Sequence, residues 1–218
     1  MIEALREVGY PAPRIELAVQ LDNGVALLQE LLPGSKIDHV TSGLLNHALA
    51  LNDLQAGVLA QRSRVRPIDL HLLEDGPGFC LHGPLREHSR RSARLDRWIR
   101  EVGGEHPLAL LGDDAVHFDF HLGNLLADAD RVTGVIDWDG AGRGDRRFDL
   151  VTLRFGLRPK SVAPGVVGHL AEILDAMAPE ILRPAWAHMS LRMTDWAIRH
   201  FTPGEVEQWL DLAELRAL

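Results

Sequence analysis

A short region of the chain holds several polar side chains that could bind a metal ion or accept a proton. It begins with HFDFHLGNLL, which runs from His117 to Leu126, and continues with GVIDWDGAGRGDRRFDL, residues 134–150. The flanking residues are apolar, which predicts burial, and a buried carboxylate is costly unless it is hydrogen-bonded, paired or bound to a metal. The region is therefore the first candidate for a functional site.

Three residues of this region have the right chemistry to divide a phosphoryl transfer between them. Asp119 and Asn124 are five positions apart, and Asp137 follows thirteen positions after Asn124. Gly123 and the mixed polarity predict a loop at Asn124, and a short hairpin then leads to Asp137. Mg²⁺ prefers oxygen ligands and usually takes one or two carboxylates plus substrate phosphates. Asp119 would remain free to accept a proton from an alcohol, as in the catalytic loop of kinases.

Other chemistries fit the same region less well. His117 and His121 have the H-x-x-x-H spacing of a zinc site, but a metalloprotease needs Glu directly after the first His, where Phe118 stands. Ser190 lacks the flanking residues of a hydrolase nucleophile. Asp139 either reaches a second metal or faces solvent. The kinase interpretation is favoured over zinc binding, hydrolysis and a set of purely structural polar groups.

The region closely resembles the aminoglycoside phosphotransferase family, the antibiotic-kinase and choline-kinase-like branch of the kinase fold. The sequence motifs of this family are close to H-G-D-x-H-x-G-N, then I-D-W, then G-D-x-x-x-D-L. The matching residues here are His117, Asp119, His121, Gly123, Asn124, Ile136, Asp137, Trp138, Gly144, Asp145, Asp149 and Leu150. Phe118 departs from the glycine of the family pattern. Upstream, GYPAPRI and LLQELLPG resemble the segment and hinge strand that precede the catalytic region.

The resemblance implies an α+β, protein-kinase-like fold. Residues 1–34 would form a reduced N-terminal β lobe with its hinge strand. Residues 35–218 would form a mainly helical C-terminal lobe that carries the catalytic and metal loops. The Pro33-Gly34 pair marks the boundary between them.

The resemblance also assigns roles to residues. Asp119 would be the catalytic base, braced by His117, and Asn124 and Asp137 would bind Mg²⁺. Structural support would come from His121, Asp145 and Asp149. The nucleotide, ATP or GTP, would meet Glu30, Leu31, Leu32 and Ile136.

Acceptor binding is expected further along the chain. Asp195 and Trp196 fall where relatives build the acceptor pocket, although Asp and Trp at helical spacing are also typical of surface and core positions. Lining a pocket, such carboxylates would suit a cationic antibiotic of amino-sugar or peptide type. The expected activity is phosphorylation of a hydroxyl group on a small molecule, with an aminoglycoside-like antibiotic as one candidate.

Two parts of a kinase are not visible in the sequence. There is no Gly-rich phosphate loop, and the only lysines, Lys36 and Lys160, do not lie on an early strand. The first strands of the small lobe are therefore expected to be missing, with Glu3 either the helix glutamate of a kinase or a plain surface residue. A truncated or non-catalytic family member that binds a small ligand, and a structural partner protein, remain alternatives.

Composition narrows the cellular setting. The formal charge of −8 disfavours nucleic acid as a partner, because phosphate backbones need a basic face. Cys80 is the only cysteine, which suits a reducing compartment. The N-terminus lacks the features of a signal peptide, and no apolar run is long enough for a membrane span. A cytoplasmic protein is expected, and the sequence does not indicate its oligomeric state.

Periodicity and turn residues predict a little β structure followed mainly by helices. A hairpin is expected from residues 14–20 and 25–32 around Asp22-Asn23-Gly24, and a later strand over 131–137. Residues 64–88 are expected to be mostly loop. The expected helices span residues 2–9, 42–61, 87–101, 148–155, 166–177, 182–200 and 204–218. The basic face of residues 87–101 is read as a solvated surface.

Overall fold

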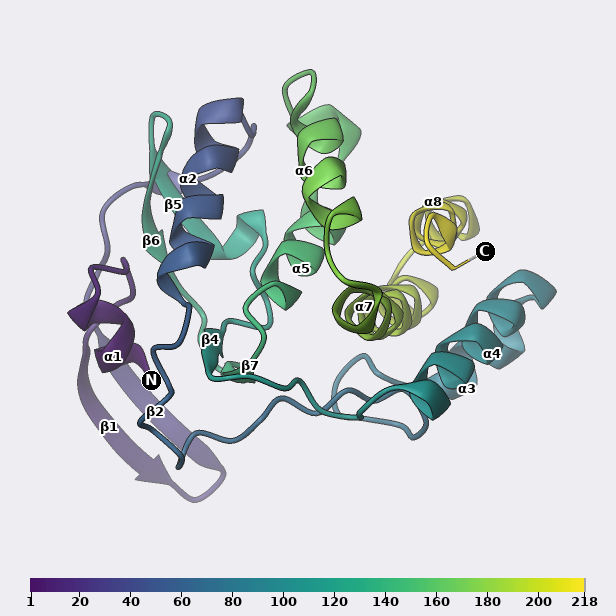
Figure 1. Ribbon diagram of the computed structural model, residues 1–218, viewed down its shortest axis with the longest axis horizontal. Coiled ribbons are helices and arrows are strands. Elements are labelled where there is room, and N and C mark those ends of the chain that lie inside the picture. The colour runs from purple at the N-terminus through teal and green to yellow at the C-terminus, as the bar shows by residue number, and fades with distance from the viewer. Residues whose placement is uncertain (218) are drawn as a thin grey trace. The chain divides into compact units, whose positions relative to one another are not determined.

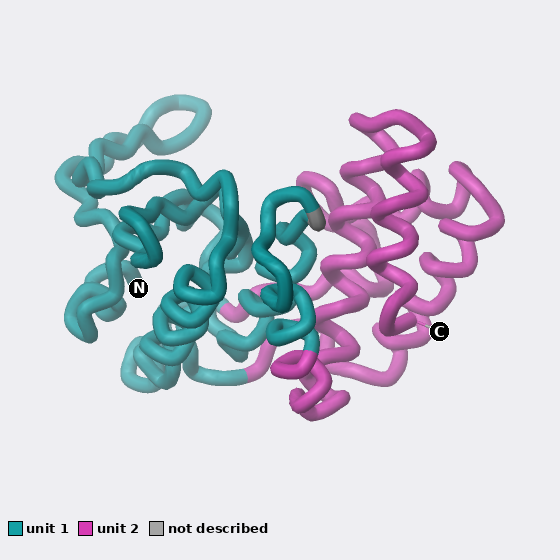
Figure 2. Tube along the Cα trace, turned by 90° about the horizontal axis from the view of Figure 1, so that it is seen from above, with its two compact units in different colours: residues 1–66, 112–171 teal, residues 67–111, 172–218 magenta. Residues whose placement is uncertain are grey.

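The computed structural model describes residues 1–217 (Figure 1). Among these residues, eight α-helices accompany three small antiparallel sheets, so the predicted α+β class is confirmed. None of these helices is long and apolar enough to cross a membrane. The chain divides into two compact units, which Figure 2 colours separately: residues 1–66 with 112–171, and residues 67–111 with 172–218. The predicted lobe boundary at residues 34–35 is a different division and stays a prediction.

The first unit begins with a short helix and a β-hairpin. Helix α1 (Ile2–Glu7) precedes strands β1 (Ile15–Leu21) and β2 (Gly24–Gln29), which pair antiparallel. Gly24 has φ +155°, and Leu21 pairs with it across the turn, which confirms the expected hairpin. Strand β2 ends at Gln29, so residues 30–32 lie beyond the strand that was expected to include them.

The middle of the first unit is a three-stranded sheet covered by a helix. Strands β3 (Ser35–Lys36), β5 (Leu125–Asp128) and β6 (Arg131–Val135) lie in the order β3-β5-β6. Helix α2 (Ser42–Leu54) lies against β6 (Figure 1). The sheet therefore holds both ends of the β5–β6 hairpin in place: Asn124 directly precedes β5, and Asp137 follows β6.

A second pairing joins the two halves of the candidate site. Strands β4 (Asp114–Val116) and β7 (Gly142–Gly144) are antiparallel, with Val116 opposite Gly142. The segment that starts at His117 and the segment that follows Asp137 are thus held at the same end of this ladder. The unit continues with α5 (Phe148–Gly156), the 3₁₀ turn η2 (Pro159–Ser161) and the first part of α6 (Val166–Asp175).

The second unit is helical, as expected for the C-terminal part. Its helices α3 (His82–His88), α4 (Arg90–Glu105), α7 (Pro179–His200) and α8 (Pro203–Glu214) pack on one another. The apolar face of α4 is buried, and Arg91 on its other face forms ion pairs with three carboxylates of α8. Part of the basic face is therefore paired, where the sequence suggested only solvation.

Two element boundaries differ from those expected. Helix α2 ends at Leu54 instead of near residue 61, because the next residues form turns and Gly57 takes a left-handed φ of +64°. Helix α3 lies inside a stretch that was expected to be mostly loop. Pro84 is compatible with it because it sits in the first turn, where a backbone N–H has no partner within the helix.

Candidate active site

The loop that follows β4 carries the first group of predicted site residues. His117, the next residue after β4, is fully buried, while Phe118 and Asp119 are half-buried. Phe118 has φ +73°, in the left-handed region that favours glycine. The loop then closes with the 3₁₀ turn η1 (Leu122–Asn124), whose N-cap is His121. The backbone thus turns at Phe118, and the next side chain, that of Asp119, keeps part of its surface exposed.

His117 ties this loop to the strand that precedes Asp137. Its Nδ1 accepts a hydrogen bond from the Asp119 backbone N–H at 3.3 Å, and its Nε2 lies 2.9 Å from the Ile136 carbonyl oxygen. Burial lowers the pKa of His117 to about 4. The ring is therefore neutral near pH 7, with its proton on Nε2, where it can be donated to Ile136. One imidazole thus joins the two segments that carry Asp119 and Asp137.

Asp119 and Asn124 lie side by side. Nδ2 of Asn124 donates to the Asp119 backbone carbonyl at 3.0 Å and to its carboxylate at 3.3 Å. Because both bonds use the amide nitrogen, the amide oxygen Oδ1 of Asn124 is available to a cation. His121 lies 3.4 Å from the Asp119 carboxylate, and its Nδ1 accepts the Gly123 N–H. The side chain of Asp119 keeps 30% of its surface exposed, so an acceptor can reach it.

Asp137, which follows β6, has a left-handed backbone conformation. Its φ is +66°, a conformation that costs about 1–3 kcal/mol for a residue with a side chain and is typical of functional loops. The residue is exposed. Ile136, before it, uses both backbone groups, because its N–H donates to the Asn124 carbonyl at 2.9 Å and its carbonyl faces His117. The bond to Asn124 places the end of η1 next to the residue that follows β6.

The carboxylate of Asp149 supports the loop that starts at His117. It is fully buried in α5 and accepts the backbone N–H groups of His117 at 2.8 Å and Phe118 at 2.9 Å, together with Nε2 of Gln55 at 2.7 Å. Burial raises the pKa of Asp149 to about 7, and these three donors oppose that rise. The loop conformation at Phe118 is thus fixed by a buried acceptor.

Asn52 of α2 and Gln55, the residue directly after this helix, complete this network and were missed by the sequence analysis. Gln55 and Asn52 are buried, and Asn52 donates through Nδ2 to the Gln55 side-chain oxygen at 2.7 Å and to the Arg146 carbonyl at 2.8 Å. The available signal was two polar residues three positions apart at the end of α2. Such a pair needs internal partners, which Asp149 and the loop at Arg146 provide.

Asp145 acts within its own loop. Its carboxylate accepts the backbone N–H of Arg147 at 2.9 Å and pairs with the Arg147 guanidinium. The neighbouring anchor is Asp114, which starts β4 and accepts the N–H groups of Gly57 and Arg146. The turn before α5 is thus held from both sides. The predicted tie from Asp145 to the catalytic loop stays a prediction.

The residues present suit a hard divalent cation. One exposed carboxylate on Asp137 and one amide oxygen on Asn124 make a partial oxygen-donor set, the kind that Mg²⁺ completes with phosphate oxygens and water. Within the described part of the chain, no three His, Cys, Asp or Glu side chains group as a metal site.

The predicted nucleotide-binding residues lie after β2. The Glu30 N–H donates to the Arg14 carbonyl at 2.9 Å, and its carboxylate pairs with Arg6 of α1. Glu30 therefore joins the end of the hairpin to its start and to α1. The Glu30 pKa is lowered by the Arg14 N–H bond and by the nearby arginines. Leu31 is 95% exposed, and the side chain of Leu32 lies close to Gly134 on β6. Nucleotide contact by residues 30–32 and Ile136 stays a prediction.

The predicted acceptor residues lie in the second unit. Asp195 is fully buried, accepts the Leu81 N–H at 2.9 Å and pairs with Arg199. Trp196 packs edge-to-face against Trp209 and Phe201. Both side chains thus have internal partners in that unit, and their part in acceptor binding stays a prediction.

Comparison with known proteins places this geometry in a family. The sequence matches the phosphotransferase enzyme family, APH, over residues 1–189. No curated protein sequence matches the chain significantly.

Solved structures of small-molecule kinases share the fold. A thermostable mutant of the aminoglycoside phosphotransferase APH(4)-Ia, in a ternary complex with ADP and hygromycin B, superposes with a TM-score of 0.65 at 17% identity, covering 99% of this chain and 82% of that one. An amicoumacin kinase in complex with AMP-PNP, Ca²⁺ and Ami gives 0.57 at 16% identity, covering 98% and 74%. A glucosamine kinase gives 0.55 at 20% identity, covering 98% and 67%.

At these identities the structures establish the fold, which is that of the protein-kinase-like small-molecule kinases. The family match over residues 1–189 covers most of the chain. The chain is therefore a member of the phosphotransferase enzyme family.

Proposed function

We propose that the chain is an ATP- and Mg²⁺-dependent O-phosphotransferase that phosphorylates a hydroxyl group of a small molecule. The observation that carries this proposal is the pairing of Asn124 with Asp119, which sets a carboxylate able to accept a proton beside an amide oxygen able to bind a cation. His117 links this pair to the strand that ends at Asp137. Family membership supports the same reaction class.

The residues divide the reaction as follows. Asp119 orients the acceptor hydroxyl and takes its proton as the oxygen attacks the terminal phosphorus of ATP; the bond to the bridging oxygen breaks, and ADP leaves. Asn124 Oδ1 and the Asp137 carboxylate would hold Mg²⁺, which would supply neutralisation of the phosphate charge. Asp149 and His117 keep the loop in shape, which matters because positioning and electrostatics account for most of the catalysis of phosphoryl transfer.

A cationic amino sugar or aminoglycoside-like antibiotic is our preferred acceptor class. Asp139 is exposed and Asp119 is half-buried, so two carboxylates other than the proposed metal ligand Asp137 belong to this region. Their negative potential favours a positively charged acceptor. The similar structures include an aminoglycoside phosphotransferase in complex with hygromycin B and a glucosamine kinase. Hygromycin B and glucosamine both belong to this chemical class.

A phosphoryl-transfer assay tests the proposal. The purified chain is incubated with Mg-ATP and a panel of hygromycin B, glucosamine and the neutral sugar glucose, and the phosphorylated acceptor is detected by mass spectrometry. Asp119→Asn should lower turnover by about 10²–10⁴-fold, the usual contribution of a general base, while nucleotide binding persists. Asp22→Asn, on the exposed hairpin turn, is the charge-matched control. Equal turnover by the two variants would contradict the role of Asp119.

A second candidate function is ligand binding without transfer. It is favoured by the position of the two lysines: Lys36 lies on β3, paired with β5, and Lys160 lies in η2, so neither is on β1 or β2. Nucleotide-dependent stabilisation without product formation for any acceptor would support this candidate over the enzyme.

A further inference from the structure

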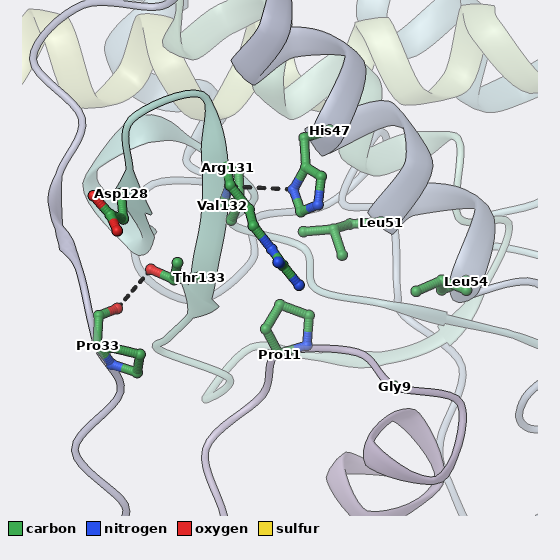
Figure 3. Close-up of a pocket in the computed structure, with 10 residues that line it drawn as sticks. All are labelled: Gly9, Pro11, Pro33, His47, Leu51, Leu54, Asp128, Arg131, Val132 and Thr133. Carbon is green, nitrogen blue, oxygen red and sulfur yellow. Dashed lines mark hydrogen bonds between the residues drawn. The ribbon is translucent and has the colours of Figure 1, made fainter.

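A pocket of about 550 Å³ lies in the first unit, and none of the predicted site residues lines it (Figure 3). Its volume is within the range of roughly 300–1,000 Å³ that small-molecule sites occupy. Its apolar walls include Pro11, Pro33, Leu51 and Leu54. These residues come from the loop after α1, the segment after β2 and helix α2, and the β5–β6 hairpin supplies a fourth part of the lining.

Hydrogen bonds hold the walls of the pocket in place. Nδ1 of His47, on α2, accepts the Val132 backbone N–H of β6 at 3.1 Å. The hydroxyl of Thr133 donates to the Pro33 carbonyl at 2.6 Å. Both bonds are drawn in Figure 3, and they join β6 to helix α2 and to the segment after β2. The pocket is therefore formed before any ligand enters, which reduces the entropy cost of binding.

Arg131 supplies the positive charge of the pocket. Its side chain extends from β6 into the space between Leu51 and Pro11 (Figure 3). Within residues 1–217, no carboxylate forms an ion pair with its guanidinium. His47 does not add a second charge near pH 7, because burial and the neighbouring Arg131 lower its pKa. A cation at an apolar pocket favours an anionic group on the ligand, since guanidinium binds carboxylates and phosphates through paired N–H groups.

Asp128 sets a limit on the charge of that ligand. Asp128 also lines the pocket, and its side chain lies on the other side of β6 from the guanidinium in Figure 3. A second negative charge on the ligand would be repelled there. Singly charged carboxylates fit this arrangement better than dicarboxylates or nucleotides.

We propose that this pocket is a second ligand site, separate from the candidate active site, which binds a small monocarboxylate with an apolar body. The carboxylate pairs with Arg131, and the apolar body packs against Pro11, Leu51 and Leu54. The proposal does not depend on phosphoryl transfer, so it can hold or fail whatever the activity of the chain.

Calorimetric titration with octanoate tests this site, with two probes of similar length as comparisons. 1-Octanol keeps the apolar body without the charge, and octanedioate adds a second carboxylate. Octanoate should bind with one saturable site, and both comparison probes should bind roughly ten-fold or more weaker. 1-Octanol lacks the charge that pairs with Arg131, and octanedioate carries a second charge that Asp128 repels. Amide resonances of Gly9 and Thr133 should shift during the octanoate titration, since both residues line the pocket.

Two variants assign the binding to the pocket. Arg131→Gln should weaken octanoate binding roughly ten-fold or more, as expected for loss of a charge-assisted hydrogen bond, whereas Arg64→Gln changes the net charge equally on an exposed loop and should leave it unchanged. Both positions are exposed, so both variants should fold, and their thermal unfolding verifies this. Equal binding by the two variants, shifts confined to residues outside the pocket, or no saturable octanoate binding would overturn the proposal.

Discussion

The imidazole of His117 bridges Asp119 and the residue before Asp137. Its Nδ1 accepts the Asp119 N–H at 3.3 Å, and its Nε2 lies 2.9 Å from the Ile136 carbonyl oxygen. The ring also packs edge-to-face on Trp138, at 4.5 Å between centroids. Because these contacts join the loop of the proposed base to the strand of the proposed metal ligand, His117 sets the distance between them without touching an acceptor.

Replacing His117 should therefore reduce the rate more than binding. His117→Gln can still donate to Ile136 but loses the ring nitrogen that accepts the Asp119 N–H. We expect kcat to fall by about 10²-fold, the scale for a misplacement of about 1 Å, with the KM for Mg-ATP changed little. Steady-state kinetics at saturating acceptor separates the two effects. A raised KM with an unchanged kcat would show that His117 serves ligand binding instead.

Replacing Phe118 by glycine should destabilise the fold less than replacing it by alanine. Its ring stacks on Phe148 at 5.3 Å, and its backbone is held at φ +73°. Phe118→Ala and Phe118→Gly both lose the ring, but alanine retains the strain of the left-handed backbone, about 1 kcal/mol, which glycine avoids. In denaturant unfolding, Phe118→Gly should thus be about 1 kcal/mol more stable than Phe118→Ala. An alanine variant of equal or greater stability would mean that the loop relaxes out of this conformation.

Asp149 and Asp145 should differ in their sensitivity to amide substitution. Asp149→Asn replaces an acceptor oxygen by a donor in a buried site that receives three N–H groups. At least one buried donor then loses its partner, at a cost of about 1–3 kcal/mol. Asp145→Asn weakens a partly exposed pair with Arg147 and should cost about 1 kcal/mol or less. Equal losses in chemical unfolding would argue against Asp149 as the main anchor of the loop.

Stability should fall in mild acid because of buried neutral histidines. Burial lowers the pKa of His188 to about 3 and that of His117 to about 4. The unfolded chain therefore binds more protons below pH 6.5, and stability decreases as the pH falls. Asp149 acts in the opposite direction, because its pKa is raised to about 7 and the folded state keeps a proton that the unfolded state releases above pH 4.

His188→Gln isolates one histidine from this sum. From pH 6.5 to 5, His188 alone should cost about 2 kcal/mol, and the variant should lack that part of the pH dependence. Urea unfolding of both proteins at several pH values measures the difference. Identical slopes for the two proteins would show that His188 is not held neutral in the fold.

The sequence predicted the part of the site whose residues lie close together along the chain. The spacing of Asp119, Asn124 and Asp137 indicated a loop and a hairpin, and the structure has both, with Asn124 bonded to Asp119. The hairpin around Asp22-Asn23 was likewise readable, since its turn chemistry is local. The family resemblance also implied structural support by Asp149, but the sequence could not name the three donors to its carboxylate.

The remainder depends on contacts between distant segments. Gln55 and Asn52 reach Asp149 and Arg146 from a helix more than 90 residues earlier in the chain, and no local pattern encodes that approach. The left-handed backbone at Phe118 is stabilised by the Asp149 carboxylate and the Phe148 ring, against the preference of phenylalanine itself. The pocket at Arg131 is built in the same manner, from residues that are far apart in sequence and unremarkable in each segment.

The most direct test of the proposed site is thermal unfolding with and without Mg-ATP, comparing the unmodified chain with Asp137→Ala. A ligand at about 100-fold above its Kd stabilises the native state by roughly 2.7 kcal/mol, which raises the unfolding midpoint. We predict a rise that requires magnesium, persists in the charge-matched control Asp22→Ala and is lost in Asp137→Ala. The absence of any rise in a folded sample, or an equal rise in Asp137→Ala, would contradict a magnesium–nucleotide site at Asn124 and Asp137.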